Sequence, residues 1–341
     1  MKRMLSILVL FAILALSLSA SVQAGDVVKL TYSNFFPPTH VQSKLAEAWC
    51  KEVEKRTKGK VQFQYFPGQT LTKAPQSYDG VVHGICDVAM SCFAYTRGRF
   101  PVMEVVDLPL GYTSGVQATN TVNQVYAKLS PKELSDTKVM YLHAHGPGLL
   151  HTKDKPVKAL EDMKGLKIRA HGTISDMVKA LGAAPVTMPM PEVYQALEKG
   201  VVDGAFYPVE ANKGWKLGEV DRFCTLSFPA AYTTSFFVVM NSSVWAKLPA
   251  DVQKTIQEIN AEWIVKHGQA WDQSDAEGRK FLLSQKGRQV LELAPGQDAK
   301  WRAAVKPVLE GFVKKLNNRK LDGAKTLKVA KETLAANAGN N

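Results

Sequence analysis

Arg169 is the residue whose type and place promise the most specific chemistry. It follows Leu166 and Ile168 in the segment Lys164–Ala170, which predicts a strand, and it stands at the carboxyl end of that strand. In open α/β sheets the carboxyl ends of the strands border the ligand crevice. A guanidinium there offers a planar fork of donors that matches a carboxylate. Local sequence alone leaves a surface arginine equally open, so the surrounding elements have to decide.

Three histidines could carry metal chemistry. His143 and His145 stand two positions apart, which on a strand points both rings to one face, and His171 follows not far along the chain. A metal site needs a third and usually a fourth ligand at matching spacing, and the sequence offers none. Nucleophile-elbow, phosphate-loop, zinc-protease and dinucleotide motifs are also absent from the sequence. We therefore expect no enzyme, no metal and no cofactor, and keep a metal-assisted hydrolase using these histidines as an alternative.

The four cysteines show no C-x-x-C spacing. They are Cys50, Cys86, Cys92 and Cys224. Cys86 and Cys92 are close enough in sequence for a disulfide, but their places beside helix and strand patterns favour free, buried thiols.

The N-terminus reads as a secretory signal. The basic start Met1–Arg3 precedes an apolar run over Leu5–Leu18, and small residues lead to Ala24. That run is shorter than the roughly 20 residues that span a bilayer. We therefore expect residues 1–24 to be a signal peptide and the mature protein to be exported.

Composition bounds the class of protein. The chain has 341 residues, of which 45% are hydrophobic and 22% charged, and this excludes disordered and collagenous classes and leaves room for about two domains. There are 43 basic and 31 acidic residues; losing Lys2 and Arg3 with the signal leaves 41 and a mature net charge of +10. The basic residues are dispersed apart from a Lys-rich C-terminal stretch, and no nucleic-acid-binding motif accompanies them, so we expect no nucleic-acid partner.

The elements that must position Arg169 follow an alternating order. Strand patterns over Val27–Ser33 and Lys60–Phe66 enclose a helix over Val41–Lys58, which predicts an α/β sheet. Further strands are predicted over Asp87–Ser91, Pro185–Pro189, Val202–Tyr207, Ser235–Asn241 and Val290–Leu293, and further helices over Ser77–His83, Ile174–Leu181, Pro191–Lys199, Ala250–Ser284 and Ala299–Leu316.

One local pattern occurs in each half of the chain. Residues 84–89 (GICDVA) and 200–205 (GVVDGA) both follow a helix with Gly, two apolar residues, Asp and small residues that enter a strand. This indicates two similarly built lobes. The helix over Ala250–Ser284 is about three times the usual length and could bridge them.

The run from Glu161 to Pro208 closely resembles the solute-binding subunits of tripartite ATP-independent periplasmic (TRAP) transporters. It contains KGLKIRAHG and PEVYQALEKGVVDGAFYP. Phe100-Pro101, Asp107-Leu108-Pro109 and the segment from Asn241 to Gln253 also resemble that family, so the likeness covers essentially the whole mature chain.

The resemblance implies a two-lobed α/β fold of the type II periplasmic-binding kind. A cleft would separate the lobes and a long helix would span both. We expect lobe I to comprise residues 25–146 and 235–274, and lobe II residues 147–234 and 275–341. The family implies a periplasmic protein, monomeric by default, that binds an organic acid and delivers it to membrane permease subunits. A sensing role beside a receptor kinase remains open.

The resemblance also assigns site residues. The carboxylate-pairing arginine falls on Arg169, and the motif positions place Met190 and Tyr207 in the cleft. Asn34, Cys92 and Phe93 would line the facing lobe. The full set of expected cleft residues adds Phe35, His145, Leu149, Phe206, Trp215 and Phe236.

Two departures from the family narrow the expected ligand. Many relatives carry a second arginine where this chain has Leu149, and an asparagine where it has Tyr207. One cation in an apolar, aromatic lining suits a monocarboxylate with an apolar or aromatic body, because a second buried carboxylate would need a partner. His145 could supply another polar contact, which would readmit 2-oxo, 2-hydroxy or dicarboxylic acids. Phe36 and Phe237 are assigned to the core.

Overall fold

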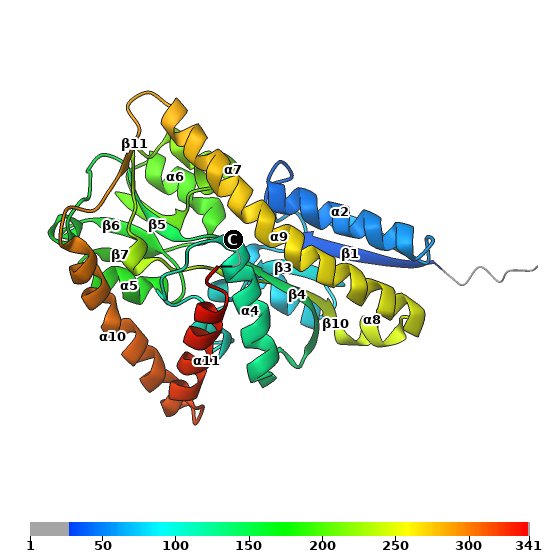
Figure 1. The fold of residues 1–341 in the computed structure, drawn as a ribbon. Helices are drawn as coiled ribbons and strands as arrows, with labels where there is room; N and C mark the ends of the chain where they lie inside the picture. The colour runs from blue at the N-terminus through cyan, green and yellow to red at the C-terminus, as the bar shows by residue number, and fades with distance from the viewer. Residues whose placement is uncertain (1–26, 340–341) are drawn as a thin grey trace, which may run out of the picture.

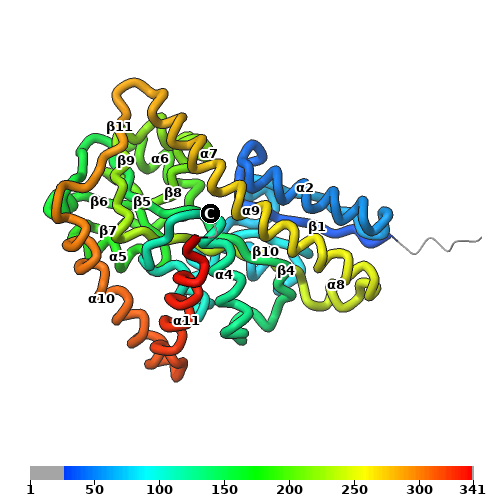
Figure 2. The backbone as a smooth tube through the Cα atoms, in the orientation of Figure 1, coloured from blue at the N-terminus to red at the C-terminus, as the bar shows by residue number. Residues whose placement is uncertain are grey.

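The computed structural model describes residues 27–339, and the expected signal peptide lies outside them. Within this range the chain builds two β-sheets covered by helices and linked by one long helix (Figures 1 and 2). We call the halves built on the two sheets the first and the second lobe. The predicted two-lobed α/β fold is confirmed by this architecture and by the solved structures described below.

The first sheet has five strands in the order β2-β1-β3-β10-β4. They are β1 (Val28–Asn34), β2 (Val61–Phe66), β3 (Val88–Cys92), β4 (Thr137–Ala144) and β10 (Ser235–Asn241). β1 runs parallel to β2 and β3, whereas β10 runs antiparallel to β3 and β4. Helices α2 (Val41–Arg56), α3 (Ser77–Val82), α4 (Gly115–Leu129) and α8 (Ser242–Lys247) accompany it.

The second sheet has six strands in the order β11-β9-β5-β8-β6-β7. They are β5 (Gly148–Thr152), β6 (Lys167–Ala170), β7 (Ala184–Thr187), β8 (Gly204–Pro208), β9 (Phe223–Thr225) and β11 (Gln289–Leu291). Helices α5 (Ile174–Ala180), α6 (Val193–Glu198) and α7 (Ala211–Gly214) belong to this lobe. β6 is parallel to both of its neighbours, so its carboxyl end, with Arg169, lies at the same edge as theirs.

Helix α9 (Ala250–Ser284) has the predicted bounds and packs against both lobes. Val252, Ile256, Ile259 and Trp263 recur at helical spacing and are buried in one apolar cluster with residues of α2 and β4. Toward its C-terminal end α9 contacts α7 and β11 of the second lobe. Gly278 permits this approach, because a Cβ there would lie 2.2 Å from the carbonyl oxygen of Val209.

The C-terminal helices α10 (Gln297–Asn318) and α11 (Gly323–Ala336) return toward the first lobe (Figure 1). α11 packs on α4, where the Lys128 Nζ donates to Thr333 Oγ1 at 2.8 Å. The lobe boundaries remain a prediction, and the tail assigned to the second lobe makes contact with the first.

The repeated Gly-x-x-Asp pattern has the same role in both lobes. Gly84 and Gly200 adopt φ of 72° and 69° just after α3 and α6. Asp87 Oδ2 accepts from the backbone N–H of Thr31, and Asp203 Oδ2 accepts from that of Lys167, both at 2.7 Å. Each aspartate therefore accepts a backbone hydrogen bond from the neighbouring strand, at Thr31 within β1 and at Lys167 at the start of β6.

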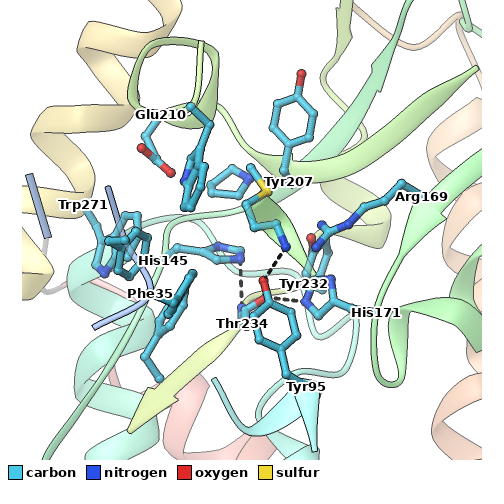
Figure 3. A pocket seen from close by; sticks show the side chains of 15 residues that line it. Phe35, Tyr95, His145, Arg169, His171, Tyr207, Glu210, Tyr232, Thr234 and Trp271 are labelled. Carbon is cyan, nitrogen blue, oxygen red and sulfur yellow. Dashed lines mark hydrogen bonds between the residues drawn. The ribbon is translucent and has the colours of Figure 1, made fainter. Parts of the chain in front are cut away.

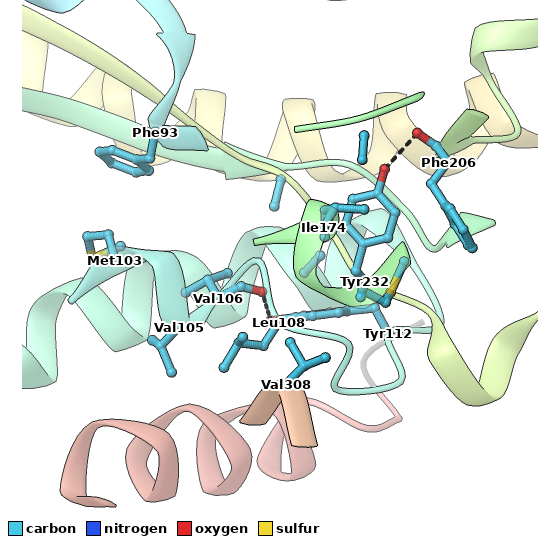
Figure 4. Packing of buried hydrophobic residues seen from close by; sticks show 14 of the residues in the cluster. Phe93, Met103, Val105, Val106, Leu108, Tyr112, Ile174, Phe206, Tyr232 and Val308 are labelled. Atoms are coloured by element: carbon cyan, nitrogen blue, oxygen red, sulfur yellow. Dashed lines mark hydrogen bonds between the residues drawn. The ribbon is translucent and has the colours of Figure 1, made fainter. Parts of the chain in front are cut away.

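The largest apolar core continues from one lobe into the other (Figure 4). Phe93 and Phe237 enter it from the first sheet, and Ile174 and Phe206 enter it from the second lobe. Val308 of α10 also belongs to this core, and within it the Tyr112 hydroxyl donates to the carbonyl of Val106 at 2.6 Å.

Among the residues described, none of the helices combines the length and apolarity needed to cross a bilayer.

Candidate functional site: a pocket between the lobes

A small pocket lies between the two lobes, beside α9 (Figure 3). Its lining is mostly aromatic, with one arginine. The lining residues are Phe35, Phe36, Tyr95, His145, Arg169, His171, Met190, Tyr207, Pro208, Glu210, Trp215, Tyr232, Thr234, Phe236 and Trp271.

Arg169 is 1% exposed and reaches the pocket from the end of β6. Its Nε donates to the carbonyl of Met188 at 3.0 Å and its Nη1 to that of Phe206 at 3.3 Å. Its Nη2 is buried without a hydrogen-bond partner. No acidic side chain in the described range forms an ion pair with it. A buried charge without a counter-ion is costly, and no acidic side chain of the described residues offsets this one.

His145 is fixed by the backbone on both sides of its ring. Its Nδ1 donates to the carbonyl of Gly146 at 2.5 Å, and its Nε2 accepts from the N–H of Thr234 at 3.0 Å. Burial, as the largest cause, lowers the pKa of His145 to about 3. Both ring nitrogens are therefore occupied, and the expected second polar contact to a ligand is not available from them in this geometry.

His171 stands beside Arg169 with one nitrogen free. Its Nε2 and Thr234 Oγ1 are 2.9 Å apart, whereas its Nδ1 is buried without a partner in the described structure. Burial, followed by the nearby Arg169 charge, holds the pKa of His171 well below its usual value. The ring is therefore neutral and has one unsatisfied nitrogen on the pocket wall.

Three aromatic rings on one side of the pocket lie nearly parallel. Phe35 and Phe236 have centroids 6.2 Å apart with planes inclined by 17°, and Phe236 and Trp271 lie 5.5 Å apart at 19°. Trp215 is also nearly parallel to Phe35, at 6.2 Å and 19°. These rings stack on one another and give this side of the pocket a flat, apolar surface.

A carboxylate lies on the opposite side of the pocket from the guanidinium. Figure 3 shows Glu210 beside the aromatic wall and Arg169 on the far side. Glu210 is 3% exposed, and its Oε2 is 3.1 Å from His40 Nε2. The pocket is thus polarised, with its positive end at Arg169.

Contacts across the cleft hold the lobes together around this pocket. The N–H of Met190 donates to the hydroxyl of Tyr95 at 2.9 Å, and His40 pairs with Glu210. Gly172, at φ +49°, approaches so closely that a Cβ would lie 2.9 Å from the Cβ of Ala94. The structure therefore represents a closed arrangement of the lobes.

Seven of the twelve expected residues line the pocket. They are Phe35, His145, Arg169, Met190, Tyr207, Trp215 and Phe236. The Tyr207 hydroxyl, however, donates to Asp221, and its ring stacks on His151 with centroids 3.8 Å apart. This hydroxyl is therefore engaged within the second lobe.

The other five expected residues are not among the lining residues. Phe93 and Phe206 point into the large core, and Cys92 and Leu149 belong to other buried apolar clusters. Asn34 holds the loop that carries Phe35: its Nδ2 donates to the Tyr65 hydroxyl at 2.9 Å and its Oδ1 accepts from the N–H of Phe36 at 3.0 Å. Its place is behind the lining. All four cysteines are free and buried.

The sequence did not assign eight lining residues to a ligand site. They are Phe36, Tyr95, His171, Pro208, Glu210, Tyr232, Thr234 and Trp271. Phe36 was expected in the core, and it does belong to a buried apolar cluster, where its ring packs against His40 at 4.4 Å, while it also borders the pocket. The helical spacing of Trp271 indicated a buried face of α9 but not that this face meets the pocket.

The alternative metal site is not assembled. Across residues 27–339, no three His, Cys, Asp or Glu side chains come together as a metal-binding group. His143 stacks instead on His267 at 4.2 Å and accepts from Trp271 Nε1 at 3.1 Å.

Two α/β lobes that close over a small pocket define the class of extracytoplasmic solute-binding proteins. Residues 32–316 match the family of bacterial extracellular solute-binding proteins, family 7, and the chain belongs to this family. It is a TRAP-type solute-binding protein for organic acids. The proteins of this family are periplasmic.

Several relatives cover nearly the whole chain. A TRAP solute-binding protein from Rhodoferax ferrireducens T118, solved with copurified benzoate, is 31% identical over 92% of this chain and 99% of that one, with a TM-score of 0.86. A marine metagenome protein specific for aromatic acid ligands, solved with 3-hydroxybenzoate, is 31% identical over 92% and 99%, with a TM-score of 0.87. The C4-dicarboxylate-binding periplasmic protein DctP of Rhodobacter capsulatus is 27% identical over 98% and 99%.

Proposed function

We propose that this protein captures an aromatic monocarboxylate between its lobes, with the carboxylate on Arg169, and delivers it to the membrane subunits of a TRAP permease. The observation that carries the proposal is the buried guanidinium of Arg169, whose Nη2 has no partner in the described range and whose charge has no acidic counterpart there. A carboxylate would satisfy both the donor and the charge.

The rest of the lining supports one carboxylate rather than two. Arg169 is the only Arg or Lys among the residues that line the pocket, and Glu210 adds a negative charge opposite it. A second ligand carboxylate would therefore meet repulsion instead of a partner. The parallel rings of Phe35, Phe236 and Trp271 favour a flat, apolar body between these ends.

Binding and closure are coupled in this proposal. The ligand touches both lobes, so its affinity for the closed arrangement exceeds that for the open one and shifts the population toward closure. In this proposal the protein is exported through the signal peptide at residues 1–24 and acts as a monomer. It then delivers the bound ligand to the permease.

A thermal-shift panel on the mature protein tests the ligand class. The panel pairs benzoate, 3-hydroxybenzoate, phenylacetate and mandelate with their amides, and adds succinate and phthalate. At about 100 times its dissociation constant a ligand adds about 2.7 kcal/mol to the unfolding free energy, which is readily detected. The proposal expects shifts with aromatic monocarboxylates and none with amides. Equal shifts with acid and amide, or shifts with dicarboxylates alone, would overturn it.

A further inference from the structure

Two buried polar atoms without partners occupy the same wall of the pocket. Arg169 Nη2 and His171 Nδ1 both lack hydrogen-bond partners among the described residues, and both side chains are at least 95% buried, with exposures of 1% and 5%. Figure 3 shows the two side chains side by side, next to Tyr232 and Thr234. Unsatisfied buried polar groups are rare and call for an explanation.

We propose that His171 is a specificity residue that donates Nδ1–H to one oxygen of the ligand carboxylate while Arg169 Nη2 binds the carboxylate. Thr234 would set the tautomer by donating its hydroxyl proton to His171 Nε2, over the 2.9 Å contact that the structure gives. This proposal rests on the proposed function, because it needs a carboxylate at Arg169.

The protonation state of His171 and its contact with Thr234 agree with this role. A ring that must place a proton on Nδ1 and stay neutral needs a donor at Nε2, and Thr234 Oγ1 is that donor. Burial and Arg169 keep the pKa of His171 well below its usual value, so the ring has a single proton to place. His145 cannot take the same role, because Gly146 and Thr234 occupy both of its nitrogens.

Arg169 and His171 together would select for a carboxylate more strongly than Arg169 alone. Two donors, Arg169 at the end of β6 and His171 just after it, would bind both oxygens of one carboxylate, whereas an amide offers an N–H₂ group where one of these acceptors is needed. We therefore infer that the ligand is a carboxylic acid bound as its anion through both oxygens. The ratio of its affinity to that of its amide should exceed the ratio that one charge contact alone would give.

Variants of the mature protein test the inference by calorimetry with benzoate and benzamide. We expect His171→Phe, which keeps a flat ring without nitrogens, to bind benzoate about 10- to 100-fold more weakly, as for loss of a hydrogen bond to a charged group. Thr234→Val should also weaken binding, whereas Thr234→Ser should restore it. His83→Phe is the control: this exposed histidine does not line the pocket and should leave the affinity unchanged.

Nitrogen NMR of ¹⁵N-histidine-labelled wild-type protein gives an independent readout that needs no folded variant. The ring nitrogen signals of His171 are assigned by their loss in His171→Phe or by their coupling to the bound ligand. In the benzoate complex these signals should show a proton on Nδ1. A proton on Nε2 alone, or wild-type affinity in both His171→Phe and Thr234→Val, would overturn the inference. If wild-type protein binds no panel acid, the proposed function itself fails, and this is seen before any variant is made.

Discussion

Replacing Arg169 by Met removes the charge while keeping most of the side-chain length. The variant loses the Nη2 donor that faces the pocket and the only Arg or Lys in its lining. The donors to the carbonyls of Met188 and Phe206 are lost as well, but the Phe206 carbonyl keeps the Tyr232 hydroxyl at 3.0 Å.

The effect on binding follows from these contacts. A hydrogen bond to a charged group contributes about 1.5–3 kcal/mol, and a carboxylate left in the pocket without a cation adds a desolvation cost. We therefore expect a loss of at least about 3 kcal/mol, or more than about 100-fold in affinity for benzoate. Benzamide should be affected far less, because it carries no charge.

Calorimetric titration with benzoate measures this loss. Arg222→Met serves as the control, because that arginine is exposed and pairs only with Asp154 at 3.6 Å. Circular dichroism checks that the fold is kept. Benzoate affinity within about threefold of wild type in a folded Arg169→Met protein would refute the reasoning that the guanidinium anchors the ligand.

Three further predictions concern the lobes and their buried acids. Gly278→Val should lower the unfolding free energy by about 1–3 kcal/mol or more, because its side chain meets a backbone carbonyl of the second lobe, whereas Gly311→Ala, with nothing within 4 Å, should be neutral or slightly stabilising; equal melting temperatures for the two variants would contradict this. Glu210→Gln should improve the affinity for phthalate relative to benzoate by about 10-fold, since it removes the opposing charge, and an unchanged ratio in competition binding would argue against a polarised pocket. Burial raises the pKa of Asp221 to about 7, so the folded state holds a proton that the unfolded state has released between about pH 4 and 7. The contribution of Asp221 to the unfolding free energy therefore falls as pH rises through that window. In denaturant titrations, the unfolding free energy of Asp221→Asn should rise by a few kcal/mol relative to that of wild type between pH 5 and pH 8. A difference between the two proteins that stays constant with pH would count against the raised pKa.

The sequence was most informative where a pattern extends over many turns or combines with a family motif. α9 was predicted with its observed bounds because its apolar residues keep helical spacing without an interrupting proline. Arg169 was singled out because it ends an apolar strand, and the family resemblance was needed to favour a ligand site over a surface arginine. The two Gly-x-x-Asp segments indicated similar lobes, and the matching bonds of Asp87 and Asp203 give the physical reason.

The choice of side-chain face was the main source of error. Successive residues of a strand point to opposite sides, so a one-residue difference moves a side chain from the pocket to the core. Phe206 and Tyr207 are adjacent in β8, yet only Tyr207 lines the pocket, and Phe206 enters the core. Cys92 and Leu149 pair in register with the lining residues Phe236 and Tyr207, so the strand face does not explain their absence from the lining; both lie in other buried apolar clusters.

Other lining residues gave no local signal. Thr234 and Tyr232 lie just before β10, in a segment that the sequence reading did not assign to any element. His171 appeared only as a metal candidate, because its free nitrogen depends on its distance from Thr234 and Arg169 in the folded chain. α4 and α11 were also not predicted, and they pack on each other from segments far apart in the sequence.

A crystal structure of the mature protein with benzoate is the most direct measurement of the central claim. The account predicts the carboxylate within hydrogen-bond distance of Arg169 Nη2, with the ring against Phe35 and Phe236 and the lobes closed. A benzoate whose carboxylate points toward Glu210, or that lies outside the interlobe pocket, would contradict it.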